Sequence, residues 1–227
     1  MRCGPSGGKP WLCWMSCSGV FSSRCLGTRQ VTLKIGRQHH LDEVASKITD
    51  GEHQTPRRVE AGIKLLSARN VQDGYLDFRN VDYIDEQEYS RIAKRCNPER
   101  DDILISCSGS IGRVAIVETD EPLGLVRSAA LVKLRKDKVK PKFLEAYLRT
   151  PFMNRLMVKS SRSSSQANLF QGPIRALPIF VPPLEVQRLY IERTIVVNEV
   201  RSTQTAAFQS LDALFSSLQH QAFRGEL

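Results

Sequence analysis

The chain has 227 residues and a formal net charge of +9, enough for one substantial domain with an appended element but not for three domains. Its 41% hydrophobic and 25% charged residues exclude a chain dominated by disorder. No apolar run reaches the roughly 18 residues that a membrane-spanning helix needs. The excess of Lys and Arg favours a polyanionic partner, either nucleic acid or an anionic membrane surface.

Residues 1–29 contain no Asp or Glu and show neither strand nor helix periodicity. They lack the clean apolar run and cleavage site of a signal peptide. We expect a disordered or non-native extension without function. The segment holds four of the six cysteines, and no pair in the chain has C-x-x-C spacing. We therefore predict no metal site, with Cys96 and Cys107 as reduced, unpaired thiols.

A short helix or strand is expected at 41–45, followed by a polar loop over 47–62. The loop collects five side chains that suit nucleic acid: His53, Gln54, Thr55, Arg57 and Arg58. Gln can pair with adenine, Arg with guanine, and Arg or His with phosphate. The alternative is a solvated surface loop without a ligand.

Alternating apolar patterns predict strands at 63–71 and 75–84, separated by a turn, and an acidic cap opens a short amphipathic helix over 85–95. Residues 101–135 then contain the apolar strands ILIS and RVAIV, joined by a turn at 107–112. A further strand lies within 125–135, with Arg127 and Ser128 near its start. Together these elements predict an α+β fold rich in strands.

The turn 107–112 includes Ser108, Gly109, Ser110 and Gly112. Its SGSIG string lacks the spacing of a phosphate loop or a dinucleotide-binding motif. A tight turn whose backbone amides approach a ligand closely remains plausible.

Residues 140–161 carry apolar side chains at helical spacing, and Pro151 should divide them into two helices that pack in the core. The polar run that follows includes Arg162, Ser164, Gln166 and Asn168. It either lines a binding surface or solvates a linker.

The C-terminal third reads as a short strand, a stop at Pro182 and Pro183, and a helix over 184–222 that no Gly or Pro interrupts. Such a helix would be roughly 58 Å long at 1.5 Å per residue. One stripe recurs at alternating steps of three and four, typical of a coiled coil: Val197, Val200, Gln204, Ala207, Leu211, Leu214 and Leu218. We predict a partner helix along this heptad stripe, in which Gln204 fixes register. The alternative is packing across the chain's own core.

Catalytic motifs are missing. The chain has no H-E-x-x-H and no G-x-S-x-G, and its four histidines are scattered. The string nearest to an adenine methyltransferase motif begins at Asn97-Pro98, and it lacks the second proline and the aromatic residue. We therefore expect a binding subunit that is not an enzyme, with no catalytic and no metal-binding residues.

Several stretches, in order, resemble the specificity (S) subunit of type I restriction-modification systems. They are KITDGEHQTP, YLDFRNVDYID, DDILISCSGSIGRVAIV, SSRSSSQANLFQGPIRALPIFVPPLEVQR and the long helix that ends in SLQHQAFRGEL. The resemblance covers about residues 41–227. It implies a target-recognition domain over 41–181 that enters the DNA major groove, and a spacer or dimerisation helix over 182–227.

The resemblance also implies recognition without catalysis, in the cytoplasm of a bacterium or archaeon. Phosphate-binding residues would lie around Arg57, Arg58, Lys159 and Arg162, and base contacts would come from Gln54, Thr55, Gln166 or Asn168. The full set of expected DNA-binding residues is His53, Gln54, Thr55, Arg57, Arg58, Ser108, Ser110, Arg127, Lys159, Arg162, Ser164, Gln166 and Asn168.

The implied partners are double-stranded DNA, methyltransferase (M) subunits and, through the complex, a restriction (R) subunit, but no membrane. S-adenosylmethionine, ATP and Mg would act in those subunits and not in this chain. Family members usually carry two recognition domains, whereas this chain has one. It is either a half-subunit that forms a homodimer through its helix or a truncated, non-functional fragment. Two other classes stay open: a coiled-coil adaptor without DNA affinity, and a self-contained DNA-modifying enzyme.

Overall fold

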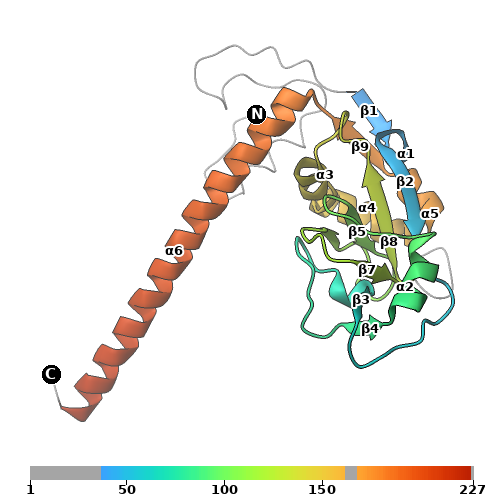
Figure 1. Ribbon diagram of the computed structural model, residues 1–227. Helices are drawn as coiled ribbons and strands as arrows, with labels where there is room; N and C mark the ends of the chain where they lie inside the picture. The colour runs from blue at the N-terminus through green and yellow to red at the C-terminus, as the bar shows by residue number, and fades with distance from the viewer. Residues whose placement is uncertain (1–36, 162–167, 226–227) are drawn as a thin grey trace.

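One long helix projects from a globule that mixes strands and helices (Figure 1). The computed structural model describes residues 37–161 and 168–225. The expected extension over 1–29 lies outside these residues, as do Arg162, Ser164 and Gln166. The architecture confirms the predicted α+β class with a long C-terminal helix.

The globule is organised around an antiparallel four-stranded sheet in the order β2-β8-β5-β6. Its strands are β2 (Ala45–Asp50), β8 (Ala129–Leu134), β5 (Ile103–Ser106) and β6 (Val114–Ile116). Successive side chains of a strand point to opposite faces. Accordingly, Ile103 and Ile105 join one core cluster, whereas Leu104 between them joins another. The run ILIS is continuously apolar because the sheet is covered on both faces.

Helices cover one face of this sheet, and a smaller sheet covers the other. The helices are α3 (Pro141–Leu148), α4 (Pro151–Ser161) and α5 (Gln171–Arg175). The smaller sheet has the order β4-β3-β7 and consists of β4 (Asp82–Ile84), β3 (Ile63–Leu66) and β7 (Leu123–Leu125). The predicted division of 140–161 at Pro151 is thereby confirmed, while α5 and β7 were not predicted.

The first and last strands of the globule, β1 (Arg37–His40) and β9 (Pro178–Val181), pair in a two-stranded antiparallel sheet. The short helix α1 (Leu41–Val44) links β1 to β2 and buries Leu41 and Val44. Helix α2 (Glu86–Ala93) follows β4, and the carboxylate of Asp85 accepts a hydrogen bond from the backbone N–H of Glu88 at its first turn. The predicted acidic cap of this helix is confirmed.

Two predicted strands are shorter than expected because a buried side chain reorganises the backbone between them. Asn70 is 2% exposed and donates hydrogen bonds through Nδ2 to the carbonyl oxygens of Asp77 and Asn80. Its Oδ1 accepts from the backbone N–H of Ser67. Such bonds compete with strand pairing. The predicted strand over 63–71 therefore ends at Leu66 and continues as a 3-10 helix, Ala68–Asn70, and the predicted strand over 75–84 forms only at its end.

The predicted loop over 47–62 is also wrong at its start, where β2 pairs with β8. The strand has an irregular register between Ala45 and Lys47, so its buried side chains do not alternate simply. Ile48 is 2% exposed and belongs to the core. The loop that remains begins at Gly51.

Helix α6 (Leu184–Arg224) ends at Gly225, which takes the left-handed conformation common at helix ends. At 1.5 Å per residue its length is about 60 Å. Residues 195–225 are all exposed, and Figure 1 shows the helix leaving the globule. The alternative in which the helix packs across its own core is therefore wrong for this segment.

Candidate functional site

Three loops meet at one end of the central sheet because its strands are antiparallel. Strands β2 and β5 end there, and β6 and β8 begin there. Backbone hydrogen bonds join the loops: the N–H of Cys107 donates to Ser128 at 2.8 Å, and the N–H of Arg127 donates to Glu52 at 3.0 Å. The topology thus gathers the segments 51–58, 107–112 and 126–128, which are far apart in the sequence.

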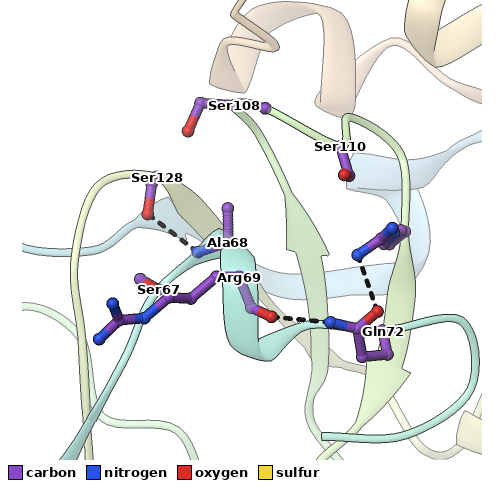
Figure 2. Close-up of a pocket in the computed structure, with 9 residues that line it drawn as sticks. Ser67, Ala68, Arg69, Gln72, Ser108, Ser110 and Ser128 are labelled. Atoms are coloured by element: carbon purple, nitrogen blue, oxygen red, sulfur yellow. Dashed lines mark hydrogen bonds between the residues drawn. The ribbon is translucent and has the colours of Figure 1, made fainter. Parts of the chain in front are cut away.

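A polar pocket of about 550 Å³ lies between the turn after β5 and the start of the 3-10 helix. We call it the serine-arginine pocket. Among the described residues, its lining is rich in hydroxyl and guanidinium groups and holds no carboxylate: Ser67, Ala68, Arg69, Gln72, Ser108, Gly109, Ser110, Arg113 and Ser128. Figure 2 shows Ser108 and Ser110 across the pocket from Ala68 and Gln72. This composition suits an anion.

A second pocket of about 400 Å³ adjoins the first, and we call it the histidine pocket. Its polar and aromatic lining comes from four segments of the chain: Asp50, His53, Ser108, Arg127, Ser128, Asn168, Phe170 and Gln171. Ser108 and Ser128 line both pockets. The two hollows therefore form one continuous polar surface, with these serines at their shared wall.

Asp50 organises the histidine pocket. Its carboxylate lies 2.7 Å from Nε2 of His53 and accepts hydrogen bonds from Arg95, at 2.7 Å, and from Nε2 of Gln171. Burial raises the pKa of Asp50, but the hydrogen bonds with His53 and Gln171 outweigh this, so its pKa lies below the ordinary value. The carboxylate is thereby held charged, and it fixes His53 in the wall of this pocket.

The arginines of the loop 51–58 are paired with carboxylates. Arg57 lies 3.2 Å from Asp85, and Arg58 lies 3.1 Å from Asp82. Both side chains are mostly exposed, and exposed pairs of this kind contribute about 0–1 kcal/mol. A DNA phosphate could replace such a carboxylate at little cost in free energy. These ion pairs therefore do not prevent Arg57 and Arg58 from binding DNA.

The structure brings together five of the expected DNA-binding residues and spreads the others. Lining one or both pockets are His53, Ser108, Ser110, Arg127 and Asn168. On the adjoining loop, exposed and not among the pocket lining, are Gln54, Thr55, Arg57 and Arg58. Lys159 is exposed in the last turn of α4 and lines neither pocket.

Sequence reasoning missed Arg69, Gln72 and Arg113, which complete the serine-arginine pocket. Arg69 and Gln72 fell within segments read as a strand and a turn. Arg113 directly follows the turn 107–112, which was predicted to approach a ligand. Its position next to Gly112 could therefore have identified it as a candidate site residue. Phe170, 56% exposed at the rim of the histidine pocket, was also missed.

The two cysteines of the described globule are unsuited to chemistry. Cys96 and Cys107 are unpaired, as predicted, and buried, and burial raises the pKa of each thiol to about 12. Among residues 37–161 and 168–225, no three or more His, Cys, Asp and Glu side chains are grouped so as to hold a metal ion. None of the helices in this part of the chain combines the length and apolar character needed to cross a membrane.

The heptad stripe on α6 lies in solvent. Its large apolar members are between 43% and 64% exposed: Val197, Val200, Leu211, Leu214 and Leu218. Gln204 and Ala207 are exposed as well. Phe208 and Phe215 lie seven residues apart and are 71% and 59% exposed. They add aromatic surface beside the stripe that the sequence reading did not include.

Comparison with known proteins gives a consistent picture. Residues 63–193, more than half of the chain, match the model of the type I restriction modification DNA specificity domain. The EcoBI type I restriction enzyme specificity subunit of Escherichia coli is 26% identical over 173 residues, an alignment covering 74% of this chain. That alignment covers 36% of the E. coli protein, so this chain spans about a third of its length.

Solved structures share the fold. The HsdS subunit from Thermoanaerobacter tengcongensis superposes with a TM-score of 0.55 at 17% identity, covering 89% of this chain and 47% of that one. A chain from work on complex assembly and conformational transition of the type I R-M system superposes with a TM-score of 0.60 at 18% identity. That match covers 89% of this chain and 48% of the other. These likenesses support the arrangement of a sheet-rich globule with a long helix.

Proposed function

This chain belongs to the family of type I restriction-modification DNA specificity proteins, and from that premise we propose that it reads a short sequence in double-stranded DNA for a modification and restriction complex. The globule, which we call the reading head, contacts the DNA, and the long helix α6, which we call the arm, positions the globule. The observation that carries the proposal is the gathering of three loops into one polar surface at one end of the central sheet.

The electrostatics of this surface support DNA as the ligand. Arg113 and Arg127 line it, and Asp50 is the one carboxylate that the described part of the chain contributes to the lining of the two pockets. Half to two-thirds of protein–DNA hydrogen bonds go to phosphate and sugar, for which Arg and Ser are suited. Side chains of the adjoining loop, Gln54 and Thr55 among them, are exposed and available for base edges.

The arm leaves the globule at the far end of the central sheet. Gln187 in the first turn of α6 bonds to Lys138 and Lys140, which follow the end of β8, whereas the polar surface lies at the start of β8. We propose that the heptad stripe pairs with the same stripe of a second copy. Two reading heads would then lie at a fixed separation and read two half-sites, since the symmetry of a dimer is mirrored in its DNA site.

In this proposal the chain binds and orients DNA and performs no catalysis. Methyl transfer from S-adenosylmethionine would belong to an M subunit, and steps that use ATP and Mg would belong to an R subunit. The part of this chain that contacts the M subunit would include α6 and the adjoining β1-β9 sheet.

The test is selection from a random duplex pool by the purified chain, with and without its M subunit, at two salt concentrations. We expect enrichment of a short motif, and an affinity that falls as salt rises. Two inverted copies of the motif at one spacing would support paired reading heads. Retention of no duplex in either form would overturn the proposal and favour a coiled-coil adaptor, while binding of S-adenosylmethionine by the isolated chain would favour a modifying enzyme.

A further inference from the structure

We infer that the serine-arginine pocket is a seat for one phosphate of the DNA backbone, in which Arg113 is the charged ligand and Ser108 and Ser110 supply hydroxyl donors. The inference rests on the proposed function and deepens it. It assigns a role to Arg113, which was not among the predicted site residues, and to a pocket whose described lining contains two arginines, four serines and no carboxylate.

Arg113 is oriented by a neutral partner. Its Nη1 donates a 2.7 Å hydrogen bond to Oε1 of Gln72, and Nε2 of Gln72 donates a 2.8 Å bond to the carbonyl oxygen of Arg69. Gln72 therefore fixes the guanidinium without neutralising it. Arg58 and Arg69, by contrast, both lie against the carboxylate of Asp82. Of these three arginines, Arg113 is the one whose guanidinium is oriented by a hydrogen bond and whose charge is not neutralised by a carboxylate in the described part of the chain.

The turn that precedes Arg113 leaves room for a ligand. Gly109 has φ +67°, a conformation that favours glycine, and a Cβ built there would meet nothing within 4 Å. Ser108 and Ser110 flank it, and Figure 2 shows both facing the pocket. The backbone N–H of Arg113 donates to Oγ of Ser106 at 2.9 Å, and Oγ of Ser106 donates to the carbonyl oxygen of Ser110. The turn and the backbone of Arg113 are thus tied to each other.

The opposite wall is fixed in a similar way. Oγ of Ser128 accepts a 3.0 Å hydrogen bond from the backbone N–H of Ala68 (Figure 2). This bond joins the start of β8 to the 3-10 helix that carries Arg69. Pre-organised donors lose little entropy when they bind an anion.

A phosphate fits these groups better than a base edge does. Guanidinium and hydroxyl groups both donate to phosphate oxygens, and charge-assisted bonds of this kind are the stronger ones. Arg can read guanine, but Nη1 of Arg113 is already bonded to Gln72. A bidentate contact to adenine, or an acceptor for the amino group of cytosine, calls for a free Asn, Gln, Asp or Glu. The lining holds one such residue, Gln72, and both ends of its amide are already bonded to Arg113 and Arg69.

The experiment compares Arg113→Gln with wild type on the selected duplex, in the DNA-binding form of the protein, over a salt series. Arg100→Gln is the matched control, because Arg100 is half-exposed, pairs with Asp120 and lies before β5, at the other end of the sheet. We expect R113Q to bind about tenfold more weakly, with the slope of log K against log salt smaller by about 0.9 and the same selected motif. R100Q should keep the wild-type slope.

A second arm identifies the phosphate. In a series of duplexes, one phosphate at a time is replaced by an uncharged methylphosphonate. At one position this replacement should weaken binding by wild type as much as the R113Q substitution weakens binding to the unmodified duplex. R113Q should lose nothing further at that position. Ser110→Ala, which removes an exposed hydroxyl, should weaken binding about threefold with the motif retained, and it keeps the test valid if R113Q proves unstable.

The outcomes separate the two proposals. If wild type selects a motif but R113Q and S110A keep its affinity and slope, the phosphate seat is wrong while DNA recognition stands. If R113Q changes the selected motif, Arg113 reads a base and the seat is again wrong. If inorganic phosphate alone competes with DNA at millimolar concentration in wild type but not in R113Q, the seat is supported. Failure of wild type to retain any duplex overturns the proposed function and this inference with it.

Discussion

The side-chain carbonyl of Gln187 accepts a 2.8 Å hydrogen bond from the backbone N–H of Lys140, and this contact joins the projecting helix to the globule. Nε2 of Gln187 donates to the carbonyl oxygens of Pro182 and Lys138, at 2.8 and 3.1 Å. Gln187 is fully buried, the only residue of α6 that is. Nearby, the rings of Phe143 and Tyr190 meet edge to face with centroids 5.6 Å apart. The direction in which the helix leaves thus depends on a few side chains in its first two turns.

Gln187→Ala should destabilise the junction, because it leaves the N–H of Lys140 and two carbonyl oxygens without their partner. We expect a loss of about 2–4 kcal/mol in the free energy of unfolding, since each buried unsatisfied group costs about 1–3 kcal/mol and water recovers part of that. Urea denaturation measures it. Gln209→Ala, on the exposed part of the same helix and off the heptad stripe, is the control and should change the free energy by less than about 0.5 kcal/mol. Equal effects of the two variants would contradict the anchoring role.

Leu214→Asp should weaken self-association without weakening the globule. Leu214 is 56% exposed in the single chain, and burying a Leu contributes about 1.5–3 kcal/mol. Because each copy loses one Leu, the dissociation constant of the dimer should rise about 100-fold or more. Sedimentation at several concentrations measures it, with Ser216→Asp, off the heptad stripe, as the control. A wild-type chain that stays monomeric at every concentration would contradict pairing through this stripe.

Gly51→Ala should disturb the polar surface at its base. A Cβ at Gly51 would lie 2.3 Å from the carbonyl oxygen of Leu125, a backbone atom with no freedom to rotate away. We expect a loss of about 1–3 kcal/mol in the free energy of unfolding, together with weaker DNA binding, because the loop that carries His53 must shift from Arg127. Gly172→Ala is the matched control, since a Cβ there meets nothing within 4 Å. Urea denaturation and a DNA titration of both variants check the prediction; a fully stable G51A variant would refute it.

Asp50→Asn should cost stability in a pH-dependent manner. The pKa of Asp50 is lower in the folded chain than its ordinary value, so its ionised form stabilises the fold above about pH 4, the unfolded pKa. That contribution is lost as the pH falls through the folded pKa. Since the carboxylate is partly exposed, we expect D50N to lose only about 1 kcal/mol at pH 7.

Free energies of unfolding for D50N and wild type at pH 7, 5 and 3.5 measure this dependence. The difference between the two proteins should be largest at pH 7 and should shrink toward pH 3.5. Asp73→Asn, in an exposed turn, is the control for the loss of one carboxylate. A difference between D50N and wild type that stays constant over this range would contradict the argument.

Sequence patterns among neighbouring residues correctly predicted the elements that depend on neighbouring residues alone. Pro151 separated two helices, Asp85 capped α2, and the uninterrupted pattern after Pro183 gave α6 almost to its end. They failed where hydrogen bonds between residues that are not sequence neighbours decided the outcome. Asn70 bonds to the carbonyl oxygens of Asp77 and Asn80 and shortened two predicted strands. The site shows the same division: the Ser108–Ser110 turn was visible in the sequence, whereas the hydrogen bond by which Gln72 orients Arg113 was not.

The sequence by itself determined the α+β class, the resemblance to specificity subunits, the uninterrupted C-terminal helix and its heptad stripe, because periodicity, proline positions and motif order are properties of neighbouring residues. Only the tertiary structure decided that loops 51–58, 107–112 and 126–128 form one polar surface, that Gln72 holds Arg113 beside Ser110, and that Gln187 fixes the base of the helix. The physical reason is that strand pairing and buried hydrogen bonds join residues tens of positions apart, and no local pattern encodes which distant donor will meet which acceptor.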